Sequence, residues 1–123
     1  MNEHRKNERR KMIAFTPVYD SNKATLLGYL GDLSMQGAML IGETPLEINT
    51  QITLVIDFPE TAEFPARQVR ISSRVAWRKQ EENTPYFNTG VEFQKVNEMY
   101  KPFLQAILER YQFRREAGGI NRP

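Results

Sequence analysis

The sequence predicts an all-β fold, a small antiparallel six-stranded β-barrel with a C-terminal α-helix. Two observations carry this prediction. Between residues 13 and 94, short stretches with apolar side chains at alternate positions are separated by turn residues, a pattern typical of small antiparallel barrels. From residue 96 onward, apolar residues recur at intervals of three and four, the period of a helix. The length of 123 residues suits one domain with one hydrophobic core.

The strands are expected over residues 13–20, 26–34, 37–42, 51–58, 68–79 and 86–94. In the first of them, Pro17 lacks a backbone N–H donor, so this strand should lie at a sheet edge or carry a bulge. Residues 35–37 have to make a tight reversal, because the second and third strands follow one another directly. Gly90 interrupts the last strand and is expected to shape a bulge there.

The strand over residues 68–79 has two distinct faces. One face carries Val69, Ile71, Val75 and Trp77, and the other carries Arg70, Arg74 and Arg78. Strand parity therefore favours Trp77 in the core, and stacking of its indole on a base is the alternative. The arginine face is typical of a solvated surface, with a secondary phosphate site or a partner site as the alternative.

The apolar stripe from Val96 to Tyr111 predicts one amphipathic helix. Asn97 is suited to cap its start, and Pro102 falls where the first turn tolerates it. Two glycines at 118–119 should end it. The stripe would cover either the open end of the barrel or the same stripe of a second chain, so a monomer and a homodimer both stay open.

The net charge of +2 is unevenly placed along the chain. Residues 1–12 hold five basic residues against two acidic ones, a local charge of +3, so the remainder sums to about −1. This division predicts a basic, flexible arm over residues 1–12 that suits an anionic partner. The barrel with its helix is expected over 13–115 and a frayed tail over 116–123. A charged terminus is also explained by solubility alone.

The composition excludes several classes of protein. There is no cysteine, which rules out thiol chemistry and cysteine-rich metal sites. No apolar run approaches the roughly 20 residues of a membrane span, and the N-terminus lacks the apolar centre of a signal peptide. A cytoplasmic protein without membrane insertion is the expectation.

The chain has few residues that are suited to act as a nucleophile, an acid or a base in catalysis. The single histidine, His4, lies in the basic arm, where nothing positions it as a base. A relay of Ser34, His4 and Asp32 is conceivable, but these residue types coincide often by chance. No glycine-rich phosphate loop and no pair of histidines at metal-ligand spacing occurs. We therefore expect no enzyme, no metal and no cofactor.

Two short motifs together resemble a known family. Arg5 and Arg9 form an RxxxR pattern in the arm, and residues 32–37, DLSMQG, form a DxSxxG pattern between two predicted strands. This combination on an all-β body resembles the PilZ domain, the bacterial receptor module for cyclic di-GMP. Residues 75–77 (VAW) and 90–93 (GVEF) are similar to the same family, and the resemblance covers roughly residues 5–115.

The resemblance implies cyclic di-GMP as the ligand and a set of contact residues: Arg5, Arg9, Arg10, Asp32, Ser34, Gly37 and Trp77. An arginine fork suits the O6 and N7 acceptors of guanine or a phosphate. An ionised Asp32 would accept the guanine N1 and N2 hydrogens, while Ser34 would bind the ligand or cap its own turn. Lys6 and Arg10 form an alternative register of the arm, in which a lysine replaces one arginine fork.

The function implied is that of a receptor or adaptor domain, which orders its arm on binding cyclic di-GMP and signals to an unidentified effector protein. Two alternatives stay open. A PilZ-like adaptor would keep the fold without the ligand. A nucleic-acid-binding barrel would use the arm and the arginine face, with Tyr86 or Phe87 stacking on bases. The presence of both motifs favours the receptor over the ligand-free adaptor, and nucleic acid is the weakest of the three as a partner.

Overall fold

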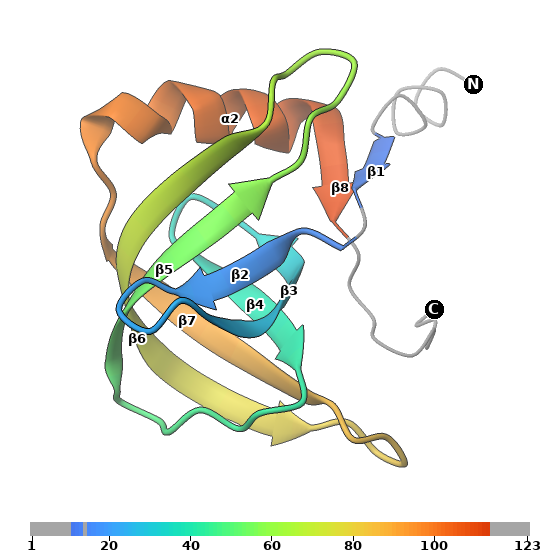
Figure 1. Ribbon diagram of the computed structural model, residues 1–123, viewed down its shortest axis with the longest axis vertical. Helices are drawn as coiled ribbons and strands as arrows, with labels where there is room; N and C mark the ends of the chain where they lie inside the picture. Colours follow the sequence, from blue (N-terminus) through green and yellow to red (C-terminus); the bar gives the residue numbers. More distant parts are fainter. Residues whose placement is uncertain (1–10, 14, 114–123) are drawn as a thin grey trace.

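The computed structural model describes residues 11–13 and 15–113, which form a closed six-stranded antiparallel barrel with one α-helix along one end (Figure 1). The expected fold class is therefore confirmed. The elements are β1 (Lys11–Ile13), β2 (Pro17–Asp20), β3 (Thr25–Leu33), β4 (Gly37–Gly42), β5 (Gln51–Phe58), β6 (Arg67–Gln80), β7 (Phe87–Lys95), η1 (Glu98–Tyr100), α2 (Lys101–Arg110) and β8 (Tyr111–Phe113).

The barrel closes in the strand order β2-β3-β4-β7-β6-β5, with β5 paired again to β2. Alternation along the strands directs one set of apolar side chains inward, where they are fully buried. The core includes Val18, Leu30, Leu40, Leu54, Ile56, Val69, Ile71 and Val75. Closure leaves the six-stranded barrel without free sheet edges.

The helical stripe covers the end of the barrel within the same chain. Leu104 and Ile107 of α2 are buried in the barrel core. The ring of Phe103 packs edge-to-face on Phe58, with 5.4 Å between the ring centroids. The Asn97 side chain accepts a hydrogen bond from the Met99 N–H at 3.0 Å, so the predicted cap is confirmed, although it caps the short 3-10 turn η1 that precedes α2.

The helix ends earlier than its apolar stripe predicted. Tyr111 has extended backbone angles (φ −130°, ψ 153°) and begins β8. This short strand pairs in parallel with β1, so the first predicted strand, residues 13–20, is divided between two sheets. Phe15 has a φ of 59°, a left-handed conformation that a continuous strand does not accommodate. The register shift between Val18 and Tyr19 is the irregularity that Pro17 predicted near the start of β2.

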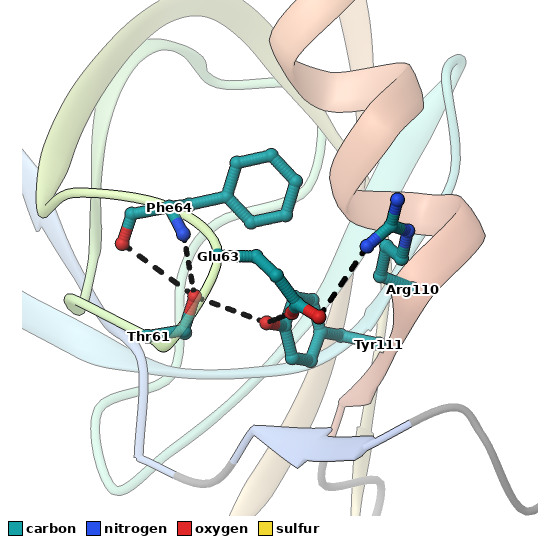
Figure 2. A network of polar contacts seen from close by, with 5 residues as sticks. All are labelled: Thr61, Glu63, Phe64, Arg110 and Tyr111. Atoms are coloured by element: carbon teal, nitrogen blue, oxygen red, sulfur yellow. Dashed lines mark hydrogen bonds and ion pairs between the residues drawn. The ribbon is translucent and has the colours of Figure 1, made fainter.

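A polar network holds the end of α2 against the loop between β5 and β6 (Figure 2). The Tyr111 hydroxyl donates to the carboxylate of Glu63 and lies 3.0 Å from Oγ1 of Thr61. The Thr61 Oγ1 atom also accepts the Phe64 N–H at 3.0 Å, and Arg110 lies 3.3 Å from the Glu63 carboxylate. Tyr111 also pairs with Lys11 of β1, so the network and the strand pair β1–β8 meet at this residue.

Candidate ligand-binding site

The DxSxxG motif forms the turn that joins β3 to β4. The Ser34 N–H donates to the Gly37 carbonyl at 2.9 Å, and the Ser34 Oγ accepts the N–H groups of Gln36 and Gly37 at 3.1 and 3.2 Å. The Gln36 carbonyl accepts the Phe93 N–H at 2.8 Å, which ties the turn to β7. Of the two roles expected for Ser34, the structure shows the capping of its own turn. Contact of Ser34 with a ligand stays a prediction.

Gly37 allows two strands to approach one another closely. A Cβ atom at this position would lie 2.3 Å from the backbone carbonyl oxygen of Val91 on β7, well inside contact distance. Gly37 pairs with Glu92 in this ladder and is not among the described residues with positive φ. The glycine is therefore needed for the seam between β4 and β7, which keeps the motif turn against the barrel.

Asp32 stands at one end of a cross-strand row on the outer face of the barrel. It pairs with Met39 of β4, Met39 pairs with Gly90 of β7, and Gly90 pairs with Trp77 of β6. Directly paired residues place their side chains on the same face of a sheet. Asp32 and Trp77 are both exposed, and the Asp32 Oδ1 accepts the Leu33 N–H at 3.0 Å. We call these four residues the Asp32–Trp77 row.

The prediction that Trp77 packs in the core is wrong, because its side chain is 45% exposed on the outer face. Val75 pairs with Val91 and Trp77 pairs with Gly90, so Ala76 is an extra residue without a partner on β7. This bulge reverses the parity of the strand after Val75. Val75 therefore points into the core, while Trp77 points outward.

The indole of Trp77 lies directly against the backbone of Gly90. A Cβ atom on Gly90 would lie 2.1 Å from Nε1 and 2.2 Å from Cε2 of the indole. No residue other than glycine fits beneath the ring in this position. The pairing fixes the height of the ring above the sheet and leaves part of its surface accessible for stacking.

The described residues bring together only part of the predicted site. Asp32, Ser34 and Gly37 share one turn, and Trp77 lies in the row that begins at Asp32. Arg5, Arg9 and Arg10 lie outside the described residues, as does Lys6 of the alternative register. The contacts of the arm with a ligand therefore stay predictions.

Met39 is the member of the row for which the sequence predicted no role. It lies partly buried between Asp32 and Gly90 on the same face. Gly90 was expected only to shape a bulge, whereas the structure places the Trp77 ring over it. A glycine inside a strand signals the close approach of another group, and this was the available hint that an aromatic ring covers it.

Across residues 11–13 and 15–113, no group of three or more His, Cys, Asp or Glu side chains is arranged to hold a metal ion. In the same part of the chain, no helix has both the length and the apolar character needed to cross a membrane.

Comparison with known protein families finds one described as the PilZ domain, whose model matches residues 3–111. The matched range includes the arm arginines, the DxSxxG turn and the whole Asp32–Trp77 row. Neither the curated proteins nor the solved structures contain a match to this chain.

Proposed function

Because the chain belongs to the PilZ domain family, we propose that it is a cyclic di-GMP receptor without catalytic activity whose output passes to a partner protein. PilZ domains are ligand-binding adaptor domains rather than enzymes. The observation that carries the proposal for this chain is the Asp32–Trp77 row beside the DxSxxG turn. The row presents a carboxylate and an exposed indole on the same face of the barrel.

The two ends of the row can bind different parts of a guanine nucleotide. Asp32 supplies an acceptor for the N1 and N2 hydrogens of guanine, which an ionised carboxylate can meet with two oxygens. Trp77 supplies a flat ring on which a base or an arginine guanidinium can stack. Three strand spacings separate these residues, a distance of about 14 Å. A dinucleotide with two guanines is long enough to use both.

The arm supplies the positive charge that the row lacks. In the proposal, Arg5 and Arg9 clamp the phosphates or guanine edges, with Arg10 as a helper, and the arm becomes ordered when the ligand binds. Its point of attachment supports this role. β1 pairs with β8, and β8 packs beside β3, the strand that carries Asp32. The arm therefore leads into a strand pair that packs beside β3.

Calorimetric titration of the full chain with cyclic di-GMP tests the proposal. Asp32→Asn should weaken binding by about tenfold or more, because a hydrogen bond to a charged group contributes about 1.5–3 kcal/mol. Arg9→Ala should have an effect of similar size for the same reason. Glu82→Gln removes an exposed carboxylate in the turn between β6 and β7 and is the matched control; its affinity should equal that of the wild type.

The outcomes separate the competing functions. No heat of binding with wild-type protein would contradict the receptor function and favour an adaptor that works without ligand. Binding to a single-stranded oligonucleotide, with a steep salt dependence and no response to cyclic di-GMP, would favour the nucleic-acid-binding barrel. Unchanged affinity in both variants would remove the row and the arm from the site.

Two further features belong to the proposal. Cyclic di-GMP is a messenger inside cells, so the receptor is placed in the cytoplasm. The chain works as a monomer or a homodimer; with α2 already packed on its own barrel, a dimer would need another surface, and light scattering with and without ligand distinguishes the two states.

A further inference from the structure

Arg70 and Arg74 lie on the outer face of β6, whereas Arg78 follows the bulge at Ala76 and pairs with the buried Thr89, which puts it on the other face. The arginine face that the sequence predicted is therefore divided, and its members have different partners. Arg74 forms a salt bridge of 2.8 Å with Glu92. Arg78 donates to the backbone carbonyl of Leu46 at 3.0 Å. Arg70 lies on the outer face with Arg74, but among the described residues no carboxylate lies within ion-pair distance of its guanidinium. Of the basic face that the sequence predicted, Arg70 is therefore a cation still available to a partner.

A second cation without a carboxylate lies next to Arg70. Lys95, the last residue of β7, pairs with Ser72, which is two residues beyond Arg70 on the same strand. Arg70 and Lys95 are thus diagonal neighbours, with about 7–8 Å between them. In the part of the chain that the structure describes, Lys95 forms no ion pair. Two exposed positive charges at this spacing repel one another, and an anion placed between them removes the repulsion.

Both cations line a groove of about 550 Å³ on the outer face of β5, β6 and β7. The hydroxyl groups of Thr53 and Ser72 lie in a row with Lys95 and supply donors along the groove. The acidic residue in its lining, Glu98, is 2.8 Å from the ammonium of Lys101, so its charge is already balanced. The Arg70 guanidinium is held in place by a hydrogen bond to the Ser21 hydroxyl at 2.5 Å.

We propose that this Arg70–Lys95 groove binds an extended acidic segment of a partner protein. Side chains two residues apart on an extended chain project to the same side, about 6.6–7 Å from one another. Two carboxylates with that spacing match the two cations one for one. No aromatic side chain lines the groove among the described residues, so a nucleic acid would find no base-stacking platform there.

The groove is separate from the Asp32–Trp77 row. Ser72 and Trp77 lie on the same strand about 15 Å apart, and the salt bridge between Arg74 and Glu92 lies between them. A partner in the groove therefore leaves Asp32 and Trp77 accessible. The inference rests on the charges and contacts of β6 and β7 and stands without the proposed binding of cyclic di-GMP.

Chemical-shift titration of the full chain at low salt tests the inference. The probes are a short peptide that alternates glutamate with glycine and a matched peptide with glutamine in place of glutamate. The acidic peptide should shift the amide signals of Thr53, Ser72 and Lys95, and the glutamine peptide should not. The double variant Arg70→Gln, Lys95→Gln should weaken binding by about tenfold, since each exposed ion pair accounts for up to about fivefold.

Arg74→Gln is the matched control, because it removes a cation from the same strand that already has a carboxylate partner. Its affinity for the acidic peptide should stay within about twofold of the wild type. Measurements on the wild-type protein are enough to overturn the inference: equal shifts with both peptides, or no shifts with the acidic one, would contradict it. So would an unchanged affinity in the double variant, or tighter binding of single-stranded RNA through the same residues.

Discussion

Strand β6 presents two different surfaces on one outer face of the barrel. Toward its start, Arg70 lies beside Lys95, and among the described residues neither has a carboxylate partner. Toward its end, Trp77 lies over Gly90 in the row that begins at Asp32. Cross-strand neighbours therefore decide what each segment of the strand can bind. An arginine with a facing glutamate is neutralised, and a tryptophan with a facing glycine is held flat against the sheet.

The two surfaces therefore suit different chemistry. The Trp77 end offers a flat ring and a distant carboxylate, which fits an aromatic base with hydrogen-bond donors at its edge. The Arg70 end offers paired cations and hydroxyl groups, which fits carboxylates. One strand can in this way serve a nucleotide and a polypeptide without the two competing for the same side chains.

The largest expected effect comes from breaking the seam that supports the Asp32 end. Gly37→Ala should lower the free energy of unfolding by about 2–3 kcal/mol, because its Cβ atom would collide with the backbone carbonyl of Val91. Urea unfolding measures this change.

Gly31→Ala is the matched control for that substitution. Its Cβ atom would lie 2.8 Å from the ends of two side chains, Ile41 and Met39, which can move aside. Its cost should stay below about 1 kcal/mol. Equal costs for the two variants would show that the β4–β7 seam is not the reason for the glycine at position 37.

The next effect distinguishes the two surfaces by their ligands. Trp77→Ala should weaken cyclic di-GMP binding by about tenfold, because stacking of one base on an aromatic side chain is worth about 1–3 kcal/mol. Trp77→Phe should retain part of the affinity. Binding of the acidic peptide to the Arg70–Lys95 groove should be unchanged in both variants, and calorimetry with each ligand measures the contrast. A loss of both ligands together would mean that Trp77 acts through the fold.

The smallest effect is expected at the boundary between the surfaces. Arg74→Gln removes a salt bridge whose side chains are 31% and 61% exposed, so its cost should be only about 0.5 kcal/mol. Thermal unfolding at low and high salt measures it, and the difference from wild type should shrink as salt rises. A cost several times larger would mean that the pair organises the strand rather than merely neutralising its charge.

The regular parts of this fold could be predicted from local patterns. Alternating apolar residues located the barrel strands, the change of period located the helix, and Asn97 and Pro102 marked its start. The DxSxxG turn followed from the close spacing of two strands around residues 35–37. These features depend on residues adjacent in sequence, which is why a single sequence predicts them.

The irregular parts depend on pairing between distant segments. Trp77 points outward only because Ala76 has no partner on β7. The register between two strands cannot be predicted from the sequence of either strand alone. The parallel pair of β1 and β8 joins two segments of three residues each, from opposite ends of the described chain. Neither segment is long enough to show a periodic pattern, so the stripe through Tyr111 predicted a longer helix instead.

The most direct test of the account is the map of chemical-shift changes when the full chain is titrated with cyclic di-GMP. Shifts are expected at Asp32, at Gly90 and at the indole N–H of Trp77, the only tryptophan in the sequence. The amides of Thr53, Ser72 and Lys95 should stay unchanged. Shifts centred on those three residues, or no shifts anywhere with excess ligand, would contradict the assignment of the Asp32–Trp77 row as the cyclic di-GMP site.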